Sequence, residues 1–225
     1  MIDTALLVVV ASLLAVQLAQ RYRLRARLAL LRRPLSKVSD GRTGSVRLEG
    51  RVMAADLSLV HAPVSGAPCL FYDCVVEQQA GEPGEESTHR VRREYRGVSF
   101  RIDDGTGIAL VRFLYAGQTP AVPLEFDGPP GVSCAIPFDQ KVDRGPELRA
   151  ALERLFMIRS VDDLPGHTFA REGRIVPGDH VSIVGVASFE VDPGTFAHRG
   201  PPRTYVVTHA VGKSLVIVAS ARPSP

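Results

Sequence analysis

A run of apolar residues at the start of the chain restricts its architecture more than any other feature. Residues 4–20 (TALLVVVASLLAVQLAQ) contain no charged side chain. As a helix they would measure about 25 Å, against about 30 Å for the hydrocarbon core of a bilayer. The side chains of Arg21 and Arg23 are long enough to reach the polar interface and cover this difference. Residues 1–20 are therefore predicted to be a transmembrane anchor.

A basic segment follows the apolar run directly. Residues 21–37 hold seven basic side chains and no acidic one. The first four are Arg21, Arg23, Arg25 and Arg27. Positive residues keep their side of a span in the cytoplasm, which predicts a single-pass protein of the cell (inner) membrane with its C-terminal domain in the cytoplasm. A cleaved signal peptide would instead carry basic residues before the apolar run, where this chain has none. We interpret residues 21–45 as a basic juxtamembrane collar and linker.

The remainder of the chain is slightly acidic, so no nucleic acid is expected as a partner. Arginine far outnumbers lysine, which is typical of a GC-rich, bacterial genome. The three cysteines, Cys69, Cys74 and Cys134, are too few and too scattered for a disulfide framework. Free thiols in a reducing compartment are therefore expected.

The pattern of residues 46–219 predicts a β-rich domain. Apolar alternation or β-branched and aromatic residues predict strands at 46–52, 69–78, 90–102, 108–114, 180–191, 203–211 and 214–219. Turn sequences separate several of them, at 63–68, 103–107 and 176–179.

One segment, 146–158, predicts a soluble helix with Leu152 and Phe156 in its apolar stripe. The expected fold class is thus mainly β with one soluble helix (α+β). It comprises two small β-barrel-like lobes, 46–114 and 171–219, together with an N-terminal transmembrane helix and a short tail at 220–225.

No arrangement of residues in the sequence indicates a catalytic or metal site. Cys69 and Cys74 are five apart on one predicted strand and would point to opposite faces, which makes them a poor pair of metal ligands. Asp103 and Asp104 begin a sequence typical of a hairpin turn and lack the further carboxylates of a calcium loop. The histidines show no metal-ligand spacing, and no GxSxG elbow is present. We predict no catalytic residues, no metal and no cofactor.

Four segments occur in a recognisable order: GRV (50–52), PVSGAPCLFY (63–72), FRIDDGTGIALV (100–111) and REGRIVPGDHVSIVG (171–185). Beside an apolar N-terminal segment, they resemble the GIDE domain, also called the Beside-A-Membrane domain, over about residues 46–219. The resemblance implies structural roles for the matching positions. These are Gly50, Gly66, Pro68, Cys69, Tyr72, Asp104, Gly105, Gly107, Pro177, Gly178 and Asp179.

In eukaryotes this domain occurs in a mitochondrial membrane-anchored ubiquitin ligase that also carries a RING domain. A RING requires eight Cys and His ligands in close pairs, and three scattered cysteines do not supply them. We therefore expect a non-catalytic interaction module that binds another membrane or membrane-proximal protein. Two alternatives stay open. One is a component of an E3 ubiquitin-ligase-type system whose RING comes from another chain, and the other is an uncharacterised enzyme.

Overall fold

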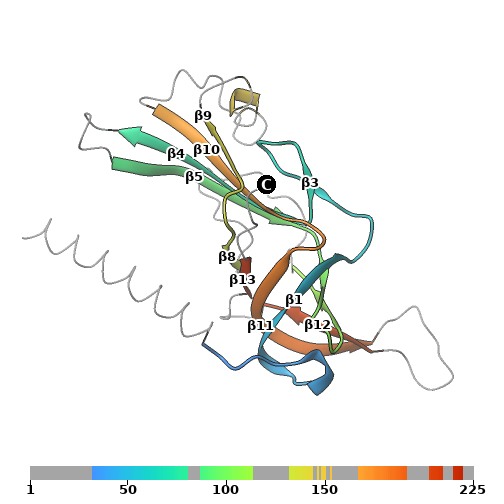
Figure 1. Cartoon of the computed structure of the whole chain (residues 1–225). Coiled ribbons are helices and arrows are strands. Elements are labelled where there is room, and N and C mark those ends of the chain that lie inside the picture. Colours follow the sequence, from blue (N-terminus) through green and yellow to red (C-terminus); the bar gives the residue numbers. More distant parts are fainter. Residues whose placement is uncertain are drawn as a thin grey trace, which may run out of the picture.

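The computed structural model of the chain describes residues 32–80, 87–113, 132–143, 146, 148–150, 153, 167–191, 203–209 and 215–219. Strands dominate these residues (Figure 1). In chain order the elements are the 3-10 turn η1 (Val38–Asp40), β1 (Gly44–Ala54), β2 (Val60–His61), β3 (Pro68–Cys69), β4 (Phe71–Ala80), β5 (Ser87–Gly97), β6 (Phe100–Asp103), β7 (Ile108–Val111), β8 (Val132–Ala135), β9 (Gln140–Asp143), β10 (His167–Ile175), β11 (His180–Val191), β12 (Arg203–Thr208) and β13 (Leu215–Ala219).

Five of the strands close into a barrel. β1 pairs antiparallel with β6 and with β11, while β6 and β7 form a hairpin. β12 completes the ring, because it pairs parallel to β7 and antiparallel to β11. The resulting order, β1-β6-β7-β12-β11 and back to β1, is that of a Greek-key barrel of the OB type. β13 and β8 extend the same sheet beyond β11.

Side-chain alternation along β1 explains how the barrel is filled. Val46, Leu48, Gly50 and Val52 are buried, and the residues between them are at least partly exposed. The inward side chains join one large core that also contains Phe100 and other residues of β6, β7, β11 and β12. A Cβ atom at Gly50 would lie 2.2 Å from the carbonyl oxygen of Asp103, so only glycine permits this approach of β1 to β6.

A second sheet, in the order β5-β4-β10-β9, is assembled from insertions into the barrel. β4 and β5 lie between β1 and β6 in the chain, whereas β9 and β10 precede β11. Figure 1 shows this sheet projecting from the barrel, with β10 leading directly into β11. Near the junction, Phe71, Tyr95 and Ile175 belong to the barrel core. A separate cluster, which includes Cys74 and Leu148, is buried elsewhere on the second sheet.

The expected fold class is wrong in its architecture. The segments 46–114 and 171–219 do not form two barrel-like lobes, because β1 and β11 pair over their length and share one barrel. Alternation in a sequence shows which face of a strand is buried but does not identify its partner. The fold is mostly β. Among the described residues, the 3-10 turn η1 is the one helical element with both ends defined.

The structure describes part of one predicted helix, 146–158, and none of the other, 4–20. Of the segment 146–158, helical backbone is described at residues 146, 148–150 and 153, and the side chain of Leu148 is fully buried. Leu152 and Phe156 lie outside the described residues. Within the described ranges, no helix has the length and apolar character needed to cross a membrane. The predicted transmembrane segment 4–20 lies outside these ranges, so a transmembrane helix is not part of the fold that the structure describes.

The segment before β1, predicted to be a polar linker, packs against one end of the barrel. Val38 contacts the barrel core, and its peptide N–H donates a 2.7 Å hydrogen bond to the carboxylate of Asp104. The peptide N–H of Ser36 donates to the carbonyl oxygen of Arg47 at 2.8 Å. We call the end of the barrel that contains Ser36, Val38 and Asp104 the η1 end.

Candidate functional site

A buried carboxylate, Glu172, lies near the junction of the second sheet and the barrel. It is on β10, where alternation places Thr168, Ala170, Glu172 and Arg174 on one face of the sheet. The Glu172 side chain has no exposed surface. A charged group in such a position requires hydrogen-bond donors, because burial removes the water that would otherwise solvate it.

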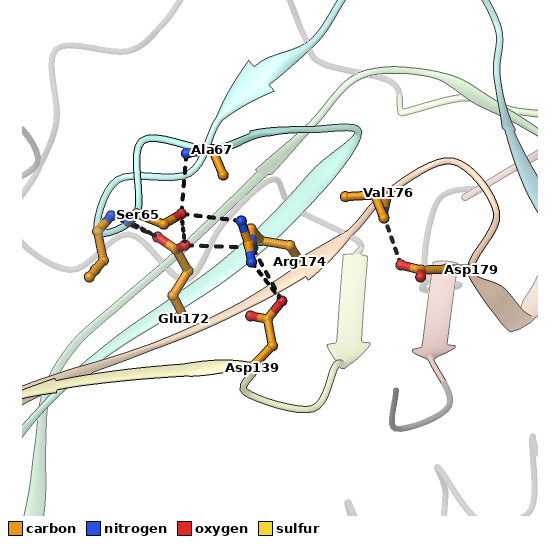
Figure 2. A network of polar contacts seen from close by, with 8 residues as sticks. Ser65, Ala67, Asp139, Glu172, Arg174, Val176 and Asp179 are labelled. Atoms are coloured by element: carbon orange, nitrogen blue, oxygen red, sulfur yellow. Dashed lines mark hydrogen bonds and ion pairs between the residues drawn. The ribbon is translucent and has the colours of Figure 1, made fainter. Parts of the chain in front are cut away.

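The donors come from the turn at residues 63–67. The peptide N–H of Val64 donates to Oε2 of Glu172 at 2.7 Å, and that of Ser65 donates to the same oxygen at 3.3 Å. The Ser65 hydroxyl donates to Oε1, as Figure 2 shows. Both carboxylate oxygens are therefore used to hold this turn against β10.

Arg174 links the same carboxylate to a third segment. Its Nε lies 3.9 Å from Oε1 of Glu172, and its guanidinium donates two hydrogen bonds, of 3.2 and 3.1 Å, to Asp139. The peptide N–H of Asp139 also donates to the carbonyl oxygen of Glu172 at 2.9 Å. Glu172, Arg174 and Asp139 thus tie the residues before β9 to β10 (Figure 2).

Cys69 and Cys74 lie in the same buried cluster, which contradicts their predicted placement on opposite faces. The expected single strand is interrupted at Leu70, so β3 ends at Cys69 and β4 begins at Phe71. Burial, assisted by the charge of Glu172, raises the pKa of Cys69 to about 12. Burial also raises the pKa of Cys74, again with Glu172 as the next cause. Both thiols remain protonated at neutral pH and are poor nucleophiles there.

A second buried ion pair joins the two sheets. Nε and Nη2 of Arg93 donate to the two carboxylate oxygens of Asp73 at 2.7 and 2.6 Å. Nη2 also donates to the carbonyl oxygen of Cys134 at 3.2 Å, and Cys134 lies on β8 in the barrel sheet. The hydrogen bond to Asp73 raises the pKa of Arg93, while burial raises that of Cys134. The Asp73–Arg93 ion pair therefore holds β4, β5 and β8 together.

The structure brings two of the family-like segments together at the turn between β10 and β11. The peptide N–H of Gly178 donates to the carbonyl oxygen of Val52 at 2.8 Å, and the N–H of Val52 donates to the carbonyl oxygen of Asp179 at 2.8 Å. The Asp179 carboxylate accepts the N–H of Val176 at 2.8 Å. Pro177 and Gly178 form the turn itself, with Gly178 at a φ of 98°.

Asp104 organises the predicted hairpin turn between β6 and β7. Burial alone would raise its pKa, but hydrogen bonds from Val38, Thr106 and Gly107 outweigh that effect and lower the pKa. Gly105 has a φ of 79°, and a Cβ at Gly107 would lie 2.8 Å from Cγ1 of Val38. The turn therefore also anchors the segment that precedes β1.

The other predicted positions that the structure describes lie in the turn at residues 63–67, in β3 and in β4 of the second sheet. Gly66 lies in the turn over Glu172 with a φ of 69°, and Pro68 and Cys69 form β3. The Tyr72 hydroxyl donates to Glu94 at 2.7 Å. Arg21, Arg23, Arg25 and Arg27 lie outside the described residues.

Sequence reasoning missed Glu172, Asp73 and Arg93. The available signal was strand alternation, which places Glu172 of HTFAREGRI on the same face as Thr168 and Ala170. Over the described ranges, no group of three or more His, Cys, Asp or Glu side chains could hold a metal ion. The arrangement around Glu172 joins a turn, a strand and a connecting segment.

Comparison with known proteins does not assign the chain to a family. No protein-family model matches it, and neither the curated proteins nor the solved structures gave a significant match. The resemblance to the GIDE domain therefore stays a prediction.

Proposed function

We propose that this chain is a non-catalytic protein-interaction module held beside the bacterial inner membrane by its N-terminal segment. Binding would occur in the cytoplasm, because the arginines after residue 20 favour that side. The buried carboxylates and thiols of the described residues serve the fold, which favours a binding role over catalysis. Glu172 and Asp73 have structural donors, and burial suppresses the ionisation of Cys69 and Cys74.

The observation that carries the proposal is an ordered turn that presents two leucines to solvent. Leu57 is 101% exposed and Leu59 is 44% exposed. The turn is held by the peptide N–H of Ser58, which donates to the Asp56 carboxylate at 2.6 Å. Hydrogen bonding to Ser58 lowers the pKa of Asp56, so the carboxylate is ionised at neutral pH. An apolar tip kept in place by its own backbone is suited to entering a pocket of another protein.

The position of this turn agrees with a partner in the cytoplasm. It follows the end of β1, whereas the N-terminal segment enters at the start of β1. The eleven residues of β1 have a contour length of about 35 Å, and the two leucines follow the end of β1 opposite to the one that the N-terminal segment enters. A partner that binds here would approach the end of β1 that lies away from the N-terminal segment.

Site-specific photocrosslinking in the native cells tests this proposal. The full-length protein would carry a photoreactive residue at Leu57, with Arg51, an exposed position of β1, as the matched control. We expect one discrete polypeptide adduct at Leu57, its loss in a Leu59→Glu variant, and no such adduct at Arg51. Equal labelling at both positions, or an adduct that persists in Leu59→Glu, would contradict the proposal.

A further inference from the structure

The exposed hydrophobic side chains of the described residues are not evenly distributed. Seven large ones are exposed, and four of them border the segment that wraps the η1 end of the barrel. The four are Leu35 (55%), Ile108 (49%), Phe189 (43%) and Val191 (53%). Water-exposed apolar groups gathered at one end of a domain indicate a surface that is covered in the functional state.

One ring contact and several chain positions relate these residues to one segment, residues 33–45. A Cβ at Gly41 would lie 3.4 Å from the ring of Phe189, and that ring packs on Tyr205 at a centroid distance of 5.2 Å. Val191 follows two residues later on the same strand. Ile108 follows Gly107, at which a Cβ would meet Val38, so the Ile108 side chain points to the other face of β7. Leu35 precedes Ser36, which is hydrogen-bonded to Arg47 of β1.

Cationic side chains accompany the apolar ones. Arg33, Lys37 and Arg42 belong to the same segment, Arg32 directly precedes it, and all four are exposed. The carboxylates nearby also have partners. Asp104 accepts hydrogen bonds from three peptide N–H groups, whereas Asp103 accepts one from the N–H of Gly105. Asp40 accepts a hydrogen bond from the N–H of Lys37, and Glu190 forms an ion pair with Arg112. Asp40, Asp103 and Asp104 keep their negative charges, so the net positive charge beside this end comes mainly from Arg21, Arg23, Arg25 and Arg27 in the adjoining connection. An exposed apolar surface next to such a basic connection fits the interface of an anionic bilayer.

The chain itself brings this end to a membrane. Residues 21–31 separate the apolar run 4–20 from the η1 end, and they extend at most about 40 Å. Four further arginines lie within that short connection. The connection joins the described domain at residue 32, so the η1 end is the part of the barrel that lies next to it in the chain.

We propose that the η1 end of the barrel docks onto the anionic headgroup surface of the bilayer, with Phe189, Val191 and Leu35 entering the interface and Arg33 and Arg42 contacting lipid phosphates. This proposal rests on the membrane anchoring proposed above and adds an orientation to it. The domain stands upright on the membrane and presents Leu57 to the cytoplasm.

Tryptophan fluorescence offers a direct test, because the natural chain contains no tryptophan. Full-length Phe189→Trp and, as the control at the opposite end, full-length Leu57→Trp are each placed in nanodiscs of phosphatidylglycerol and phosphatidylcholine with brominated acyl chains. Val191→Trp serves as a second reporter at the η1 end in case Phe189→Trp disturbs the packing on Tyr205. Circular dichroism confirms that each variant is folded.

Docking predicts that bromine quenches Phe189→Trp and Val191→Trp by about half or more and leaves Leu57→Trp unchanged, since an interfacial ring lies within about 10 Å of the acyl boundary. Adding Arg33→Glu and Arg42→Glu should lower the ratio of docked to undocked protein by at least about 25-fold, because each arginine contributes about fivefold. Quenching should therefore fall toward the value of Leu57→Trp.

The possible failures are distinguishable. Protein that enters the discs with both η1-end reporters unquenched overturns the docking but leaves the anchoring. Quenching of Leu57→Trp alone shows the opposite orientation and also overturns it. A blue-shifted emission that does not respond to bromine shows that a second protein copy covers this end instead of lipid. Failure of the chain to associate with the discs overturns the anchoring on which the docking depends.

Discussion

Glu172 holds its charge where water is excluded, and three donors from the turn over it offset the free energy of that burial. This side chain therefore stabilises the structure only together with the turn at residues 63–67. Its loss leaves two peptide N–H groups and the Ser65 hydroxyl without their acceptor.

The first prediction concerns this carboxylate. Glu172→Ala should lower the free energy of unfolding by about 3 kcal/mol, because buried donors lose their partner. Glu172→Gln should cost about 1 kcal/mol, since one oxygen still accepts. The measurement is urea unfolding of the full-length protein in detergent, followed by far-UV circular dichroism. Glu190→Ala is the control, because Glu190 forms an exposed ion pair with Arg112 and its loss should cost less than about 1 kcal/mol. Equal losses for Glu172→Ala and Glu190→Ala would contradict the proposed role.

The second prediction is a pH dependence. The pKa of Cys69 rises from 9.0 to about 12 on folding, so folding favours the protonated thiol. Its stabilising contribution is fully present below about pH 9 and is lost as the pH rises through the folded value. Burial raises the pKa values of Cys74 and Tyr72 in the same direction. We therefore expect the urea midpoint to fall steadily above about pH 9.

The control for this pH dependence is Cys69→Ala, in which the decline should be shallower. The folded protein should also react with iodoacetamide much more slowly than the urea-unfolded protein at about pH 8. Rapid alkylation of the folded protein, or a midpoint that stays constant on the alkaline side, would show that the thiols are accessible.

At the scale of elements, turns were easier to predict than strand partners. The residues of DDGTG and VPGD specify tight turns locally through Gly105, Gly178 and the carboxylates of Asp104 and Asp179, and both turns are present. The expected strand 90–102 is instead β5 and β6 in different sheets, interrupted at residues 98–99. The strand-like pattern of residues 90–102 does not show that the chain leaves one sheet and enters another.

The third prediction concerns the closure of the barrel at Gly50. Gly50→Ala should destabilise the protein by about 3 kcal/mol, because the new methyl group overlaps the backbone of Asp103. Gly66→Ala provides the comparison, since a Cβ there meets nothing within 4 Å and only the φ of 69° opposes it. That variant should lose about 1 kcal/mol. Thermal unfolding of both variants separates the two effects, and a smaller loss at Gly50 than at Gly66 would refute the steric explanation.

At the scale of the whole molecule, the candidate site was predicted less well than the elements. The segments around Gly66, Cys69 and Asp179 stood out in the sequence, but the side chain that joins the first of them to β10 is Glu172, which lies more than one hundred residues away from Ser65 in the chain. The single barrel was missed for the same reason, because β1 and β11 meet from opposite ends of the domain. Contacts of this range depend on the complete fold and leave no local pattern.

The fourth prediction concerns orientation in the membrane. A reporter that is active only outside the cytoplasm, fused after Pro225, should give background activity if the arginines hold the domain inside. Replacing Arg21, Arg23, Arg25 and Arg27 together with alanine should raise that activity several-fold, because the orientation preference depends on these charges. Replacing Arg171, Arg174, Arg203 and Arg112 of the β domain should not. Strong activity of the unaltered fusion would reverse the predicted topology.

The pairing of β1 with β11 also sets the time at which the barrel can close during synthesis. Gly44 leaves the ribosome long before its partner Ala187, and at 5–20 residues per second the interval lasts roughly 7–30 s. Throughout that time β1, with its alternating apolar residues, has no strand with which to close the barrel. A nascent chain of this kind exposes an unclosed sheet until β11 and β12 emerge, and a chain released before residue 208 would lack part of the strand that completes the barrel.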